Sequence, residues 1–247
     1  MNLLETKDLR KYFGGVRAVD GISLSILARD IVGLIGPNGA GKTTFLNLLA
    51  GLIKPSQGKI FLENEDITTT SYRERIKRGI VKSFQIPRIF GQLSCLENVK
   101  VTLFSHNRMC WKLHRSLSRN DEIHAKALEI LDLFGLRDKA DLPANKLSGG
   151  DRKLLDVAIA MCLEPKLLLL DEPTSGISTK EKTYVMDNLS SILRERGITA
   201  IIVEHDMEVV FTYTNKVAVM YEGKLLGYGK PEEIKEDKEI QKYIMGT

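Results

Sequence analysis

The pattern of apolar and polar positions predicts two kinds of β-strand in this chain. Uninterrupted apolar runs rich in β-branched residues are typical of strands that are buried on both faces of a parallel sheet. The clearest strands are predicted at residues 31–35, 80–84, 167–170 and 199–203, and the apolar ones among them are expected to be buried on both faces. Alternating patterns, which suit an antiparallel sheet with one face in solvent, occur at residues 3–9, 22–27 and 59–62. The N-terminal part is therefore expected to form an antiparallel edge sheet.

Segments with apolar residues at helical spacing separate these strands. One of them, residues 45–49, follows the first buried strand and is closed by Gly51. Between residues 85 and 147 the β-branched runs disappear, and residues 122–134 repeat apolar positions with helical period. The alternation of strands and helices predicts an α/β fold with a mainly parallel sheet, and the central stretch predicts an inserted helical subdomain.

The loop between the first buried strand and its helix, GPNGAGKTT, has the spacing of a phosphate-binding loop. Glycines such as Gly36 and Gly41 let backbone N–H groups turn inward around phosphates, and a helix N-terminus favours anions. Lys42 can supply a positive charge to the β/γ oxygens, and Thr43 can offer a hydroxyl to Mg²⁺. The alternative is a plain strand-to-helix turn in which the motif arises by chance. The strand before the loop and the helix after it make such a chance match less frequent.

Polar residues follow the other buried strands. Gln85 follows residues 80–84, Asp171 and Glu172 follow 167–170, and His205 stands just beyond 199–203. Open α/β sheets bind ligands at these carboxyl ends. Because successive strand side chains point to opposite sides, Asp171 and Glu172 are expected to do different jobs. One carboxylate would face the Mg²⁺ shell and the other the attacking water.

A second candidate anion site lies at LSGGD, residues 147–151, before another segment of helical period. Ser148 followed by Gly149 and Gly150 suits a helix cap, and the same start can hold an anion. A second anion site is surplus in a chain that already has a phosphate loop, unless it serves the nucleotide of another molecule.

Composition excludes several classes of protein. With 43% apolar and 28% charged residues, the 247-residue chain is typical of a water-soluble globular protein. Its 36 Lys and Arg against 32 Asp and Glu leave a net charge of +4, too little to indicate nucleic acid. Cys95, Cys110 and Cys162 share no metal or disulfide spacing, which favours a reducing compartment. No run approaches the roughly 18–20 apolar residues of a membrane span, so another chain is expected to supply any membrane part.

Taken together, GPNGAGKTT, Gln85, LSGGD, LLLLDEP and His205 resemble, in this order, the ATP-binding subunits of ABC transporters over essentially the whole chain. Within that family, IVGLIGPNGAGKTT, SFQIPRIF, LSCLENV and VEHDM are most similar to the branched-chain amino acid importers. The resemblance implies one ABC ATPase domain over residues 1–247. Residues 1–85 and 161–247 would form the nucleotide-binding core with its antiparallel β subdomain, and residues 86–160 the helical subdomain that carries LSGGD.

The resemblance also implies a composite ATP site, in which the phosphate loop of one subunit and the LSGGD of a second enclose ATP with Mg²⁺. The implied nucleotide contacts are Phe13, Gly36, Pro37, Asn38, Gly39, Ala40, Gly41, Lys42, Thr43 and Thr44, with Ser148, Gly149 and Gly150 from the second subunit. Phe13 would stack on adenine, with Tyr12 as the alternative. The implied metal residues are Thr43, Gln85 and Asp171. Glu172 would be the general base, His205 would contact the γ-phosphate, and Gln85 would also sense the permease.

The implied partners are transmembrane permease subunits, a second ATPase subunit in a homo- or heterodimer, and, indirectly, a solute-binding protein. The chain would then lie on the cytoplasmic face of the cell membrane and power import of branched-chain amino acids or a related small polar solute. Three alternatives stand beside this one. They are an export ATPase of lipopolysaccharide type, a soluble ABC ATPase that acts on ribosomes or DNA, and a P-loop kinase or GTPase, which has no use for LSGGD.

Two departures from the family pattern and one basic segment need explanation. Asp151 stands where the family usually has Gln, which puts a negative charge near a γ-phosphate, and Ser178 stands where most members have Asp. The segment of residues 105–119 holds Arg108, Lys112, Arg115 and Arg119 without an acid. We expect it either to form a solvated helical face or to lie near anionic lipid headgroups or an acidic permease loop.

Overall fold

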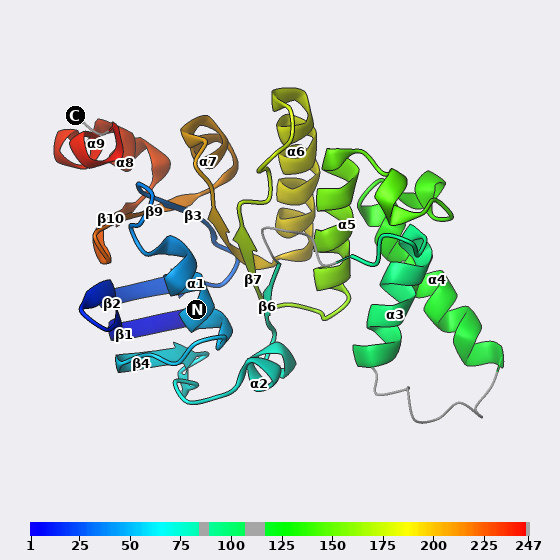
Figure 1. The fold of residues 1–247 in the computed structure, drawn as a ribbon, viewed down its shortest axis with the longest axis horizontal. Coiled ribbons are helices and arrows are strands. Elements are labelled where there is room, and N and C mark those ends of the chain that lie inside the picture. The colour runs from blue at the N-terminus through cyan, green and yellow to red at the C-terminus, as the bar shows by residue number, and fades with distance from the viewer. Residues whose placement is uncertain (84–88, 107–116, 246–247) are drawn as a thin grey trace. The chain divides into compact units, whose positions relative to one another are not determined.

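The computed structural model describes residues 1–83, 89–106 and 117–245 (Figure 1). The contacts within the chain divide it into two compact units. The first unit comprises Met1–Lys82, Lys166–Pro173 and Leu193–Thr247, and the second comprises Ser83–Pro165 and Thr174–Ile192. The second unit thus includes residues 174–192, which the sequence analysis placed in the nucleotide-binding core. The subdomain boundaries given above stay a prediction.

A six-stranded sheet organises the first unit, with the strand order β10-β9-β3-β8-β7-β6. Its strands are β3 (Ile31–Ile35), β6 (Ile80–Lys82), β7 (Leu167–Asp171), β8 (Thr199–Val203), β9 (Lys216–Tyr221) and β10 (Lys224–Gly229). All neighbours are parallel except β10, which runs antiparallel to β9. Every residue of β3, β7 and β8 is buried. The carboxyl ends of these three strands therefore meet at one edge of the sheet, and the predicted α/β class is confirmed.

This sheet differs from the predicted one at two places. β6 ends at Lys82, so the strand is shorter than the predicted 80–84. Among the described residues it lies at the edge of the sheet and pairs only with β7. β9 and β10 were not predicted from the sequence. These two strands are joined by the two-residue turn Glu222-Gly223, in which both residues have positive φ angles, 46° and 78°. This turn is the sequence signal that could have revealed the hairpin.

The first unit also holds a four-stranded antiparallel sheet with the order β2-β1-β4-β5. Its strands are β1 (Asn2–Phe13), β2 (Val16–Leu27), β4 (Gln57–Leu62) and β5 (Glu65–Asp66). β1 and β2 extend beyond the predicted 3–9 and 22–27. Asp8 in β1 and Gly21 in β2 have positive φ angles of 45° and 83°, and the pairing register shifts near Asp8. Such irregularities break the alternation of apolar and polar positions from which the strands were inferred.

The helices of the first unit are α1 (Lys42–Ala50), α2 (Tyr72–Lys77), α7 (Met207–Tyr213), α8 (Pro231–Glu236) and α9 (Lys238–Met245). α1 follows β3 directly and buries Phe45, Leu46, Leu48 and Leu49 in one apolar cluster with residues of both sheets. Gly51 ends the helix in the left-handed conformation, with φ 76°, which a glycine adopts at little cost. This packing fixes the axis of the helix that begins at the phosphate loop.

The second unit is built from helices in its described residues, apart from an isolated bridge between Ser94 and Pro143. They are α3 (Cys95–His106), α4 (Leu117–Leu133), the 3-10 turns η2 (Arg137–Lys139) and η3 (Ala144–Lys146), α5 (Gly149–Met161) and α6 (Thr179–Arg196) as far as Ile192. α4 buries Ile123, Ala127, Ile130 and Leu131, the positions that its helical period predicted.

A buried arginine holds the far end of α1. Arg75 on α2 is only 1% exposed, and its guanidinium donates to the carbonyl oxygens of Leu48 and Leu49 in the last turn of α1. It also donates to the carbonyl oxygens of Ile67 and Thr68. Burial lowers the pKa of Arg75 to about 10, so the side chain is charged at neutral pH. A cation at a helix C-terminus offsets the partial negative charge of the unpaired carbonyls.

We expect Arg75→Met to lower the free energy of unfolding by about 3 kcal/mol, because buried carbonyl oxygens lose their donors. Urea unfolding followed by circular dichroism measures the loss. The control is Arg78→Met in the neighbouring turn, where the arginine pairs with Glu65 and the two side chains are 34% and 62% exposed. An exposed pair of this kind contributes about 1 kcal/mol or less. Equal losses in the two variants would contradict the role given to Arg75.

Candidate functional site

The loop between β3 and α1 closes tightly against neighbouring backbone. A Cβ atom on Gly41 would lie 2.1 Å from the carbonyl oxygen of Ala18, and one on Gly36 would lie 2.0 Å from that of Met220. Gly41 also has a φ of 97°, in the left-handed region that disfavours side chains. The loop conformation therefore requires glycine at both positions that the spacing of the motif singles out.

Lys42, the first residue of α1, lies back along this loop. Its Nζ donates to the carbonyl oxygens of Gly36 at 2.7 Å and Pro37 at 3.0 Å. Burial lowers the pKa of the ammonium, while the carboxylates of Glu172 and Asp171 act in the opposite direction. Carbonyl oxygens of the loop thus hold the ammonium of Lys42. An anion could replace these oxygens as the acceptor of its hydrogen bonds.

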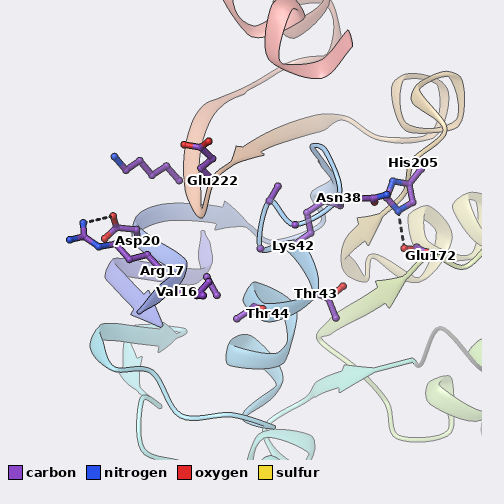
Figure 2. A pocket seen from close by; sticks show the side chains of 15 residues that line it. Val16, Arg17, Asp20, Asn38, Lys42, Thr43, Thr44, Glu172, His205 and Glu222 are labelled. Atoms are coloured by element: carbon purple, nitrogen blue, oxygen red, sulfur yellow. Dashed lines mark hydrogen bonds and ion pairs between the residues drawn. The ribbon is translucent and has the colours of Figure 1, made fainter. Parts of the chain in front are cut away.

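A cavity of about 690 Å³ opens in front of the loop (Figure 2). Such a volume suits a small-molecule ligand. The loop and the start of α1 line it with Asn38, Gly39, Ala40, Gly41, Lys42, Thr43 and Thr44; the other lining residues are Val16, Arg17, Ala18, Asp20, Glu172, His205, Glu222 and Lys224. The loop, the end of β7 and the residues after β8 therefore converge on one space.

The two adjacent carboxylates at the end of β7 point to different partners. Asp171 is 4% exposed, and its Oδ1 accepts from Thr43 Oγ1 at 3.4 Å, while its Oδ2 faces Lys82 Nζ at 3.0 Å. Glu172 instead places Oε1 at 2.9 Å from Nε2 of His205 (Figure 2). The backbone turns between them, because Glu172 has a positive φ of 53°.

Some residues singled out in the sequence do not join this cavity. Phe13, at the end of β1, is 50% exposed; it belongs to the described residues but does not line the cavity. The ammonium of Lys11 lies 5.0 Å above its ring. The hydroxyl of Tyr12 contacts Asp20 at 3.4 Å. Gln85 lies outside the described residues.

Most of the basic segment, residues 105–119, also lies outside the described residues. Residues 107–116, including Arg108, Lys112 and Arg115, lie outside the described residues, and so does the side chain of Arg119. The expectation that this segment faces anionic partners stays a prediction.

The LSGGD segment forms the start of α5 in the second unit. Ser148 is the N-cap, and its Oγ accepts from the backbone N–H of Asp151 at 3.1 Å. The N–H of Gly150 donates to Oε1 of Glu181 at 3.2 Å. The carboxylate of Asp151 pairs with Lys139 at 2.6 Å. The negative charge of Asp151 is therefore balanced within the second unit by Lys139.

Sequence reasoning missed the two residues that organise this segment, Lys139 and Glu181. The other carboxylate oxygen of Glu181, Oε2, accepts from the N–H of Ser178 at 3.1 Å and from its hydroxyl at 2.8 Å. These hydrogen bonds, with a smaller part from Gly150, lower the pKa of Glu181. The sequence signal for the contact is the Ser-x-x-Glu spacing of a capping box at the start of α6.

A phosphate-type loop after one strand of a parallel sheet, with carboxylates at the end of the next strand but one in that sheet, defines a nucleoside-triphosphate-binding protein. The family model described as "ABC transporter" matches residues 19–175, and the chain belongs to this family. ABC transporter ATP-binding domains hydrolyse ATP. The chain is therefore an ATPase, because it belongs to this family. None of the helices in the described part of the chain has both the length and the apolar character that crossing a bilayer requires.

Relatives and solved structures agree with this assignment. A protein of Archaeoglobus fulgidus named a probable branched-chain amino acid transport ATP-binding protein is 34% identical over 249 residues, which cover 100% of this chain and 96% of the relative. The ADP conformation of an ATP-binding cassette of an ABC transporter has a TM-score of 0.85 and 30% identity, with 100% of both chains covered. A dimeric post-hydrolysis cassette bound to ADP and Pi has a TM-score of 0.76 and 27% identity, with 93% of this chain and 99% of that chain covered.

We expect Gly41→Ala to lower the free energy of unfolding by about 3 kcal/mol, because left-handed strain and a backbone clash add. Gly39→Ala is the matched variant. Gly39 also has a positive φ, 82°, but nothing lies within 4 Å of the added Cβ, so the cost is about 1–2 kcal/mol. Urea unfolding compares the two variants. Equal costs would show that the close approach to Ala18 does not constrain the loop.

Proposed function

We propose that this chain is the ATPase subunit of an importer of branched-chain amino acids. The observation that carries the ATPase mechanism is the Glu172–His205 contact at 2.9 Å, made by two residues that line one cavity with the phosphate loop. The solute is supported by the name of the A. fulgidus relative, which covers the whole chain. That name favours transport of branched-chain amino acids over transport of lipopolysaccharide and over the non-transport alternative.

The loop from Gly36 to Thr44 binds the phosphates of ATP in this proposal. Backbone N–H groups at the start of α1 face the phosphates, and the helix dipole favours their negative charge. Lys42 leaves the carbonyl oxygens of Gly36 and Pro37, which it contacts at 2.7 and 3.0 Å, and contacts the β/γ oxygens instead.

Thr43 and Asp171 fit the Mg²⁺ that accompanies ATP. Thr43 Oγ1 and Asp171 Oδ1 are 3.4 Å apart, and hydroxyl and carboxylate oxygens are the ligand type that Mg²⁺ prefers. Gln85, the third residue proposed for the metal, lies outside the described residues. When bound, Mg²⁺ neutralises charge that develops on the β/γ-phosphate oxygens.

Glu172 acts as the general base. Its carboxylate takes a proton from water while the water oxygen attacks the γ-phosphorus and the bond to the bridging oxygen of ADP breaks. His205 holds the Glu172 carboxylate at 2.9 Å and contacts the γ-phosphate. The divergence of Asp171 and Glu172 at the end of β7 supports this division, because each carboxylate faces a different partner.

A second ATPase subunit completes each nucleotide site. Its Ser148, Gly149 and Gly150 approach the γ-phosphate across the interface. The similar cassette that is dimeric with ADP and Pi bound supports the dimer. Phe13, which lies at the end of β1 and does not line the cavity in the chain alone, is the residue that would stack on the adenine ring. The dimer acts on transmembrane permease subunits at the cytoplasmic face of the cell membrane, and a solute-binding protein delivers the amino acid from the other side.

The proposal is tested by Glu172→Gln, which keeps the shape of the side chain and removes the base. We expect ATP to bind while hydrolysis falls at least ~100-fold, the low end of the effect of a general base. Because hydrolysis dissolves the two-subunit sandwich, the variant with ATP should elute as a dimer from a sizing column. The wild type with ATP and Mg²⁺ should remain largely monomeric.

The control adds Ser148→Arg to Glu172→Gln. A bulky side chain at the proposed interface should abolish the dimer, while each monomer still binds a fluorescent ATP analogue. Near-normal turnover in Glu172→Gln alone would remove Glu172 from the role of base. A dimer that persists with Ser148→Arg would refute the composite site.

The solute is tested by reconstitution. The chain is purified from membranes with its bound permease subunits and inserted into vesicles that enclose ATP on the side of the ATPase, and the solute-binding protein is added outside. We expect uptake of labelled leucine, isoleucine and valine above the background set by the Glu172→Gln complex, and no uptake of labelled glutamate or maltose above it. Uptake that does not distinguish leucine from these controls would contradict the proposed solute.

A further inference from the structure

A buried lysine shares the carboxylate of Asp171. Lys82 Nζ lies 3.0 Å from Asp171 Oδ2, and the two side chains are 4% and 5% exposed. The same ammonium donates to Oδ1 of Asn47 at 2.7 Å. On the other side of the carboxylate, Asp171 Oδ1 accepts from Thr43 Oγ1 at 3.4 Å. One oxygen of Asp171 therefore faces a buried cation, and the other faces the hydroxyl proposed for the metal.

These four residues form a ring that joins three elements of the first unit. Thr43 and Asn47 lie one turn apart on the same face of α1. Lys82 ends β6 and Asp171 ends β7, and these strands are parallel neighbours in which Lys82 pairs with Leu169. The ring sets the orientation of the carboxylate, because each of its oxygens has a partner on a different element.

The ring also sets the charge at this place. A buried carboxylate without a partner is costly, and a buried pair is balanced only while both charges are present. Lys82 supplies that balance when no metal is bound. A divalent cation that approaches Asp171 Oδ1 therefore meets a carboxylate that is already neutralised, with a second cation on its far side. Like charges at such short range in a buried place repel strongly.

We propose that Lys82 is a positioning residue that acts as a built-in counter-ion to Asp171, so that divalent metal binds there only together with the phosphates of a nucleotide. The metal role of Asp171 rests on the proposed function. The consequence for the chain is an order of events. Metal and nucleotide arrive as one complex, because the negative charge that the site lacks is supplied by the β/γ-phosphates.

The test measures binding of Mn²⁺ alone, without nucleotide, by the loss of the electron paramagnetic resonance signal of free Mn²⁺. We expect weak binding to the wild type. In Lys82→Met, which removes the ammonium and keeps the length of the side chain, the affinity should rise about tenfold or more as the repulsion disappears. Lys82→Arg, which restores the charge, should bind Mn²⁺ as weakly as the wild type.

Two further variants locate the metal that Lys82→Met gains. Adding Asp171→Asn to Lys82→Met should abolish the gain. Lys166→Met removes the same charge at an exposed pair with Glu63, in which the side chains are 52% and 37% exposed, and should leave Mn²⁺ binding unchanged. No gain in Lys82→Met, a gain that survives Asp171→Asn, or an equal gain in Lys166→Met would each overturn the proposal.

A thermal measurement covers the case in which Lys82→Met folds poorly. The unpaired Asp171 should lower the melting temperature, and Mn²⁺ alone should restore it, whereas Mn²⁺ should not shift the wild type. A variant that Mn²⁺ does not rescue would contradict the counter-ion role. These measurements contain no nucleotide, so their outcome is separate from that of the proposed ATPase function, which wild-type hydrolysis decides.

Discussion

The direction of α1 is the constraint on which the site depends. The phosphate loop leads directly into its first turn, its apolar face belongs to the cluster shared by both sheets, and its last carbonyl oxygens accept from Arg75. A helix directs its N–H groups and its dipole at a ligand only while its axis is fixed. The packing and the buried arginine fix it. Close backbone contacts can therefore shape the glycine loop that precedes α1, while the direction of the helix stays the same.

The charges of the site are already paired in the chain itself. Lys42 contacts two carbonyl oxygens, Asp171 contacts Lys82, and Glu172 contacts His205. In the proposed function, Lys42 exchanges its carbonyl partners for phosphate oxygens, whereas Asp171 and Glu172 keep the partners that they already have. Such preorganisation keeps the cost of reorganising the site low. The positive φ of Glu172, 53°, separates its carboxylate from that of Asp171 and lets two neighbours in sequence serve different partners.

Both residues that depart from the family pattern, Asp151 and Ser178, have partners within the second unit. Asp151 replaces the usual Gln, and its charge is balanced by Lys139 at 2.6 Å. Ser178 replaces the usual Asp, and its backbone N–H and hydroxyl donate to Glu181, whose other oxygen accepts from Gly150 at 3.2 Å. Glu181 therefore joins the start of α5 to the start of α6. Both substitutions keep a hydrogen-bonded carboxylate close to the LSGGD segment.

Local sequence determined the buried strands β3, β7 and β8, the phosphate loop and the cap at Ser148, because hydrophobic period, glycine spacing and capping residues act over a few neighbouring positions. It also placed Asp171, Glu172 and His205 at strand ends. Only the tertiary structure decided that Lys82 meets Asp171, which lies 89 positions away, that Arg75 is buried under α1, and that Lys139 neutralises Asp151. The physical reason is that a single charged residue in a sequence gives no sign of being buried, so it is expected to lie in solvent. Its partner is set by sheet order and helix packing, which no local pattern contains.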